Sequence, residues 1–193
     1  MKVKEQAAKY LVQTKKYTYQ DYLDLPEDGK RYEVINGEFI MVAAPSTFHQ
    51  SVLINLVNDL KNFLNREKVG KVFCAPIDVK LSDRNVVQPD IIFVSQNNSN
   101  IITENNVEGT PDLIIEILSP GTAYHDLIEK KEIYERFDVK EYWIVDPKKQ
   151  RIEIYQNINQ RFELNQRIEL EGTVESLVIK GFKISLESIF SME

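Results

Sequence analysis

The 193-residue sequence contains one cysteine, two histidines and seven glycines, and each shortage excludes a class of protein. A single cysteine, Cys74, cannot form an internal disulfide, and with two histidines it offers no ligand spacing typical of zinc. The few glycines form neither a phosphate-binding loop nor a dinucleotide-binding fingerprint. The chemistry that remains is that of acids and lysines.

Long apolar runs and excess positive charge are also missing. No stretch approaches the ~20 apolar residues of a membrane span, and the start MKVKEQAAKY lacks the apolar segment of a secretory signal. We therefore expect a cytoplasmic protein that does not bind membranes. The net charge of -6 provides no global positive field to attract phosphates, which counts against high-affinity nucleic-acid binding but leaves room for a local basic groove.

The hydrophobic content of 42% is enough for one core in a chain of this length. We expect a flexible or dimer-contacting N-terminal arm, residues 1–16, followed by one domain, residues 17–193. The expected elements are a short helix ending at Pro26, a hairpin turning at Asn36 and Gly37, a long helix from Ser46, strands near 71–82, 87–94 and 112–118, a helix over 125–137, and further strands before a short final helix. This order predicts an α/β (α+β) fold with a mixed β-sheet flanked by helices.

Two acids lie within apolar strand sequences. Asp90 belongs to VVQPDIIFV, residues 86–94, and Glu116 to DLIIEILSP, residues 112–120. A carboxylate in such a strand is costly unless it is paired or binds a cation, so two of them converging would indicate a metal site. Asp112 also follows a proline, but it lies roughly 13 Å from Glu116 along the same strand. Asp90, on a separate strand, is therefore the better partner.

Lys130 lies on the apolar face of the next expected helix. At ~100° per residue, four apolar residues fall within about 60° of it: Leu127, Ile133, Tyr134 and Phe137. Lys131 falls about 100° away, so Lys130 is expected to point inward and Lys131 is not. A lone lysine on such a face commonly extends its ammonium to water, but two nearby carboxylates favour an inward role.

Each of these residues also has a structural interpretation. Glu116 could form a salt bridge with Lys130, and Asp90 could be a turn acid after Pro89. His49 lies on the apolar face of the long helix near its start, where a core or capping role competes with catalysis. A nucleophilic pair of Cys74 and His49 is conceivable, although Cys74 lies in an apolar strand.

The ordered motifs resemble those of one family over roughly residues 17–190. The segments are RYEVINGEFIMV, the helix beginning near His49, QPDIIFV, PDLIIEILSP, and the run from Lys130 to Tyr134 followed by EYWIVDP. Together they resemble the Uma-type endonucleases, restriction-endonuclease-like proteins of the PD-(D/E)XK phosphodiesterase superfamily. By this resemblance Asp90 is the acid of the Pro-Asp motif, Glu116 the acid of the following strand and Glu33 a helper acid.

The superfamily commonly carries a lysine two residues after its second acid, where this sequence has Leu118. The resemblance instead implies that Lys130, four residues before a tyrosine, is the family's lysine.

The resemblance also implies a homodimer that hydrolyses DNA with Mg²⁺, for which Mn²⁺ could substitute. Asp90, Glu116 and a backbone carbonyl such as that of Ile117 would hold the ion, while Glu33 and His49 would tune the attacking water or a second ion. The acidic net charge favours an alternative, a catalytically inactive nuclease-like fold that serves as a DNA-binding or protein-interaction module.

Overall fold

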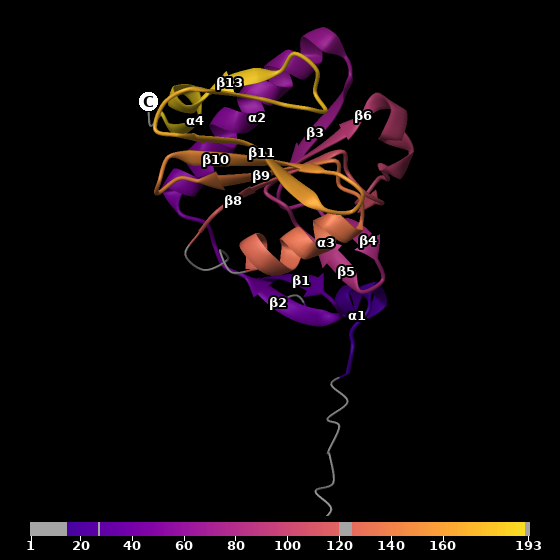
Figure 1. Ribbon diagram of the computed structural model, residues 1–193. Helices are drawn as coiled ribbons and strands as arrows, with labels where there is room; N and C mark the ends of the chain where they lie inside the picture. Colours follow the sequence, from indigo (N-terminus) through magenta and orange to yellow (C-terminus); the bar gives the residue numbers. More distant parts are fainter. Residues whose placement is uncertain (1–14, 27, 120–124, 192–193) are drawn as a thin grey trace, which may run out of the picture.

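The computed structural model describes residues 15–26, 28–119 and 125–191 (Figure 1). Of the expected N-terminal arm, residues 1–14 lie outside the described residues. Lys16 lies inside them, and its ammonium is 2.8 Å from Glu38 Oε1. None of the helices within the described ranges is both long and apolar enough to cross a membrane.

The first helix, the hairpin and the long helix form where the sequence predicts them. The bounds are α1 Tyr19–Leu23, β1 Arg31–Ile35, β2 Glu38–Val42 and α2 Thr47–Glu67. Asn36 and Gly37 both have positive φ, at 51° and 77°, as a tight two-residue hairpin turn requires. Ser46 begins α2 because its side chain accepts a hydrogen bond from the His49 backbone N–H.

Six strands form the central sheet, in the order β11-β10-β9-β8-β6-β3. Their bounds are β3 Gly70–Cys74, β6 Ile91–Ser95, β8 Leu113–Ile117, β9 Glu141–Asp146, β10 Arg151–Asn157 and β11 Phe162–Glu169. The pair β8 and β9 is parallel and the other neighbours are antiparallel, so the sheet is mixed, as expected.

A second sheet has the order β2-β1-β5-β4-β7, where β4 is Val79–Ser82, β5 Asn85–Val87 and β7 Val107–Glu108. The expectation of one sheet with strands at 71–82 and 87–94 is therefore wrong in detail. Each of those runs divides between the two sheets, and each division contains a proline, Pro76 or Pro89, which has no N–H to donate to a strand ladder.

The remaining elements are short. They are the 3₁₀ helix Gln96–Ile101, the π-helix His125–Lys130 that continues into α3 Lys131–Arg136, the hairpin of β12 Thr173–Glu175 and β13 Lys183–Ser185, and α4 Leu186–Phe190. The expected helix over 125–137 is thus present, with wider turns in its first half.

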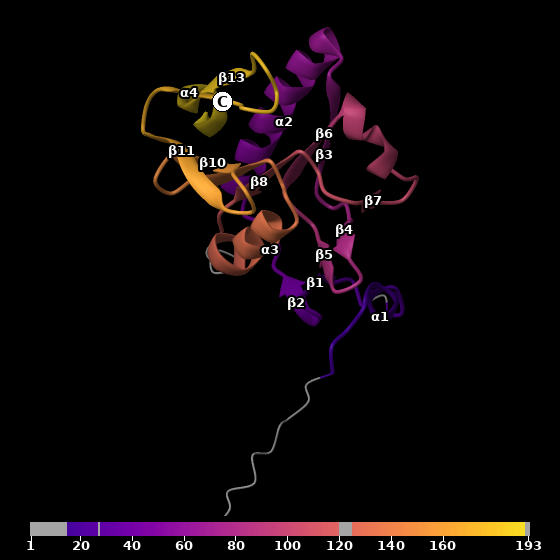
Figure 2. The same cartoon turned by 45° about the vertical axis from the view of Figure 1, so that its right-hand side comes forward.

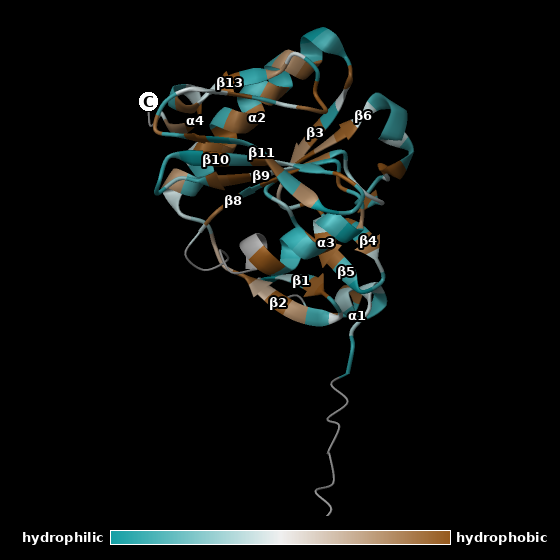
Figure 3. Ribbon diagram, viewed as in Figure 1, coloured by the Kyte–Doolittle hydropathy of each residue, from teal (hydrophilic) through white to brown (hydrophobic). Residues whose placement is uncertain are grey.

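The core lies on both faces of the six-stranded sheet. Along β8, Leu113, Ile115 and Ile117 pack with buried residues of α2 and α4, whereas Ile114 packs with Ile133 and Tyr134 of α3. Figures 1 and 2 both show α2 and α3 on opposite sides of this sheet, and Figure 3 shows apolar residues concentrated in the strands between them. Because side chains alternate along a strand, Glu116 shares the face that α3 covers.

Candidate active site

The antiparallel register between β6 and β8 brings the two predicted acids together. Ile91 pairs with Ile115, so Asp90 and Glu116 follow at the same end of the sheet. The Asp90 backbone nitrogen lies 3.5 Å from Glu116 Oε2, and the Ile117 backbone N–H donates to Asp90 Oδ2 at 2.8 Å. The two acids therefore border one site.

Asp112 lies at the other end of β8 and has a structural role. Its Oδ2 accepts hydrogen bonds from the Ser95 N–H at 2.8 Å and from Asn98 at 3.3 Å, and its Oδ1 is paired with the Lys140 ammonium. The choice of Asp90 over Asp112 as the partner of Glu116 thus agrees with the geometry.

Pro89 leaves the backbone carbonyl of Ile117 without a partner N–H from the neighbouring strand. Extending the register of β6 and β8 by two residues places Ile117 opposite Pro89, which has no N–H to donate. In a strand, the N–H and C=O of one residue point to the same side. Because the Ile117 N–H reaches Asp90, the Ile117 carbonyl points toward the Asp90 side as well.

Lys130 is buried between two carboxylates from different sheets. Its Nζ lies 2.9 Å from Glu33 Oε1 and 3.1 Å from Glu116 Oε1, and the three side chains are exposed by only 6%, 3% and 3%. The prediction that Lys130 points inward is confirmed. Lys131 instead places its ammonium 3.5 Å from the centre of the Tyr155 ring.

Tyr134 and Gln88 fix these acids, and the sequence interpretation assigned neither to the site. The Tyr134 hydroxyl donates to Glu116 Oε1 at 2.7 Å, and the Gln88 backbone N–H donates to Glu33 Oε1 at 2.6 Å. Burial, together with the nearby Glu116 and Glu33 charges, holds the pKa of Tyr134 far above its usual range. Tyr134 therefore stays a hydrogen-bond donor. Its spacing of four residues from Lys130 was the available signal, because such residues share a helix face.

His49 lies at the capped start of α2 and contacts Asp90. Its backbone N–H completes the Ser46 cap of α2, while its ring Nε2 lies 3.2 Å from Asp90 Oδ2. The ring is buried, and the Asp90 side chain is 19% exposed. His49 can therefore orient the Asp90 carboxylate, and Asp90 is the acid with the most contact to solvent at the site.

A cavity of about 60 Å³ is lined by the site residues His49, Gln88, Asp90, Glu116 and Lys130, among others. This volume has room for an ion and a few waters. Within residues 15–26, 28–119 and 125–191, no group of three or more His, Cys, Asp and Glu side chains is arranged to hold a metal ion. Two carboxylates and a backbone carbonyl suit Mg²⁺, which keeps several waters and prefers oxygen, better than zinc.

Comparison with known families shows which family the chain belongs to. A family model described as "Putative restriction endonuclease" matches residues 19–187. The chain belongs to the Uma2 family. The Uma-type resemblance of its motifs is therefore confirmed, and Uma2 membership supports a nuclease function.

The fold of this Uma2 chain also has a counterpart among solved structures. It matches the crystal structure of a protein from Anabaena variabilis ATCC 29413, described as a "putative nuclease belonging to DUF820", with a TM-score of 0.74 and 20% identity. The match covers 90% of this chain and 97% of that one, which confirms the expected mixed α/β fold. Comparison with curated proteins finds no match.

Proposed function

We propose that this Uma2 protein is a Mg²⁺-dependent endonuclease that hydrolyses DNA phosphodiester bonds. The observation that carries the proposal is the contact of Lys130 with Glu33 and Glu116, at a small cavity that Lys130 lines together with Glu116 and Asp90. A buried lysine between two acids is also compatible with a purely structural role. Family membership, the partly exposed Asp90 and the carbonyl of Ile117 favour a catalytic one.

Asp90, Glu116 and the Ile117 carbonyl are the groups that would hold Mg²⁺. The ion, when bound, would supply Lewis acidity and lower the pKa of a water molecule. Glu116 directs Oε1 toward Lys130 and Tyr134, while its Oε2 faces Asp90. Asp90 is held by His49 and the Ile117 N–H. These contacts fix both carboxylates before substrate arrives, which reduces the reorganisation needed during the reaction.

Lys130 is a cation that lines the cavity, as Arg31 also does, and it contacts the proposed metal ligand Glu116. Glu33 holds its ammonium at the cavity, where it can donate a hydrogen bond to a phosphate oxygen and stabilise the charge that builds during in-line attack. The oxygen of water forms a bond to phosphorus as the bond to the 3′-oxygen breaks. The attacking water gives up one proton to solvent and the 3′-oxygen takes one from solvent, so the products are a 3′-hydroxyl and a 5′-phosphate.

A nicking assay on supercoiled plasmid tests this function. The wild-type protein should nick plasmid with Mg²⁺ or Mn²⁺ and not with EDTA, and Glu116→Gln should reduce the rate by at least about 100-fold. Glu153→Gln is the matched control, because Glu153 on β10 accepts hydrogen bonds from Tyr155 and from Arg167 of β11 and lies outside the cavity lining. Absence of metal-dependent nicking across salt and pH, with DNA binding retained, would replace the enzyme with the binding-module alternative.

A further inference from the structure

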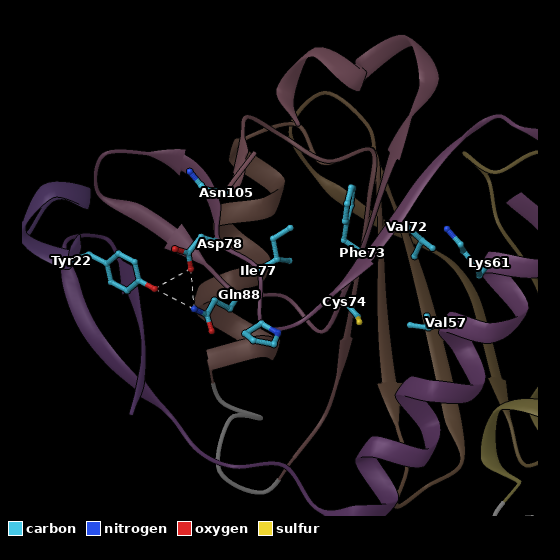
Figure 4. Close-up of a pocket in the computed structure, with 11 residues that line it drawn as sticks. Tyr22, Val57, Lys61, Val72, Phe73, Cys74, Ile77, Asp78, Gln88 and Asn105 are labelled. Carbon is cyan, nitrogen blue, oxygen red and sulfur yellow. Dashed lines mark hydrogen bonds between the residues drawn. The ribbon is translucent and has the colours of Figure 1, made fainter. Parts of the chain in front are cut away.

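A wide groove lies next to the catalytic cavity. Its volume is about 740 Å³, and its lining comes from α1, α2, β3 and the segments around Asp78 and Gln88 (Figure 4). β3 is the end strand of the six-stranded sheet, so the groove follows the open edge of that sheet. Tyr22, Asp78 and Gln88 line one side of it, and Val57 and Lys61 of α2 lie on the other.

The groove and the cavity share a wall. Gln88 lines both, and Cys74 of the groove is followed by Ala75, which lines the cavity. The Ala75 N–H donates to the Asp90 carbonyl at 3.0 Å, which ties this wall to the proposed metal ligand. A polynucleotide bound with its scissile phosphate at Asp90 would place a neighbouring nucleotide at the groove.

The lining matches the chemistry of a nucleotide. Phe73 is half-buried and offers a ring for base stacking, which tolerates any base. Lys61 is exposed and can contact a phosphate, and Asn105 offers an exposed amide. The Gln88 amide nitrogen donates to Asp78 at 2.9 Å and to the Tyr22 hydroxyl at 3.2 Å.

Gln88 also has an unmet acceptor. Its Oε1 is buried and has no hydrogen-bond partner among the described residues. A buried amide oxygen without a donor is costly and uncommon in native proteins. When a nucleotide binds, a small movement of the Gln88 side chain would let Oε1 accept a hydrogen bond from a base N–H or a sugar hydroxyl. This oxygen lies at the wall where the groove meets the cavity.

The charge of the groove argues against a double helix as its occupant. Lys61 and Asp78 are the charged side chains among the described residues that line it, and the whole chain carries -6. Duplex binding depends on several cations that neutralise phosphates. A groove of this volume suits a small-molecule-sized ligand, roughly one or two nucleotides.

We infer that this groove binds an unpaired segment of the polynucleotide substrate, with one base stacked on Phe73, the Asn105 amide facing a base edge and Gln88 Oε1 accepting a hydrogen bond after a small movement. The inference rests on the proposed function and narrows its substrate. The enzyme cuts beside unpaired nucleotides, as in single strands, flaps or bubbles, and cuts fully paired duplex slowly.

Cys74 provides a direct test, because it is exposed, lines the groove and is the chain's one cysteine. The rate of its alkylation by a maleimide is measured in EDTA, so that no cleavage occurs. The single-stranded oligonucleotides dT12 and U12 and a blunt 12-base-pair duplex are compared at equal concentration. We expect either single strand to slow alkylation at least 5-fold and the duplex to slow it less than 2-fold.

Variants locate the contact. Phe73→Leu keeps an apolar side chain but removes the ring, and it should weaken protection by single strands at least 5-fold. Phe63→Leu is the matched control, since Phe63 is also half-buried but packs against Phe182 outside the groove. Lys61→Gln should reduce the protection of Cys74 by single strands and should make that protection depend less on salt. Lys180→Gln, on an exposed loop, should change neither.

The outcomes separate this inference from the proposed function. Equal protection by duplex and single strand, or no protection while metal-dependent plasmid nicking persists, overturns the groove assignment and leaves the nuclease intact. Protection by single strands without any metal-dependent cleavage keeps the groove and removes the enzyme. Protection of DNA but not RNA, or the reverse, identifies which polynucleotide the groove accepts.

Discussion

Lys130 Nζ lies 3.1 Å from Glu116 Oε1, although fourteen positions of the sequence separate the two residues. Both side chains are almost completely buried, and Glu33 shares the same ammonium at 2.9 Å. Two carboxylates thus face one lysine in a region with little water. Removing the lysine leaves two buried carboxylates without their cation, which makes the cluster sensitive to substitution of Lys130.

Lys130→Met tests this cluster. The variant should lose about 3–5 kcal/mol of unfolding free energy, because it leaves two carboxylates buried without their cation. Mg²⁺ should then raise the melting temperature of the variant more than that of the wild type, since the ion would offset the repulsion. Urea unfolding and thermal melts with and without Mg²⁺ provide the measurements.

Lys131→Met is the control for Lys130→Met. Its ammonium lies over the Tyr155 ring rather than in the cavity, so its loss should cost at most about 2 kcal/mol and should not alter the response to Mg²⁺. Equal effects of the two substitutions on stability and on the Mg²⁺ response would show that Lys130 has no special place at the site.

Tyr134→Phe removes the hydroxyl that holds Glu116 Oε1 and leaves the ring in the core. We expect kcat to fall about 10-fold to 100-fold, as for other groups that orient a metal ligand, with little change in KM. Because the pKa of Tyr134 is held far above its usual range, the wild-type activity should show no alkaline limb from this residue below pH 10. Unchanged turnover in steady-state kinetics would mean that Lys130 alone fixes Glu116.

Asp90 and Asp112 form a matched pair, since each follows a proline. Asp90→Asn should abolish nicking and the Mg²⁺-dependent shift in melting temperature, with a small loss of stability. Asp112→Asn should lower the free energy of unfolding by about 1–3 kcal/mol, because Asp112 bonds Lys140 and the Ser95 N–H. It should keep the response to Mg²⁺, because these bonds lie away from the site. A lost Mg²⁺ response in Asp112→Asn would place the ion elsewhere.

The hydrogen bonds of Asp112 should also make the free energy of unfolding fall at low pH. Burial by itself raises the pKa of Asp112, but the hydrogen bonds from Lys140 and the Ser95 N–H outweigh it and hold the pKa below its usual range. Its contribution is therefore fully present above the unfolded pKa of about 3.9 and is lost as pH falls through the folded value. Urea unfolding between pH 1.5 and pH 6 measures this loss.

Lys140→Gln should move that loss to higher pH and reduce stability at pH 7, whereas the exposed Lys148→Gln should change neither. If the Lys140 variant retains the wild-type dependence on pH, the pair with Asp112 contributes nothing measurable, as is common for ion pairs with an exposed lysine.

Some of this site follows directly from local patterns. The helical spacing of Lys130 relative to Ile133 and Phe137 predicts its inward direction, and the separation of Asp112 from Glu116 along one strand favours Asp90 as the partner. Both inferences use fixed geometry, the angle per helical residue and the rise per strand residue. They need no knowledge of the tertiary structure.

Other features depend on contacts that no local pattern encodes. The run VVQPDIIFV is apolar on both sides of Pro89, and although the proline signals a break in the strand, the sequence does not show that the two halves join different sheets. Tyr134 has the character of a core residue, and only a partner eighteen positions away gives its hydroxyl a role. Glu33 is fixed by the backbone of Gln88, fifty-five positions later.

Anomalous diffraction from crystals soaked in Mn²⁺ tests the central claim most directly. Mn²⁺ also prefers oxygen ligands and can stand in for Mg²⁺. We predict one strong peak at about 2.0–2.3 Å from a carboxylate oxygen of Asp90, Glu116 Oε2 and the Ile117 carbonyl oxygen, with Lys130 still bound to Glu33. No peak at saturating Mn²⁺, or a peak that contacts neither acid, would contradict the account.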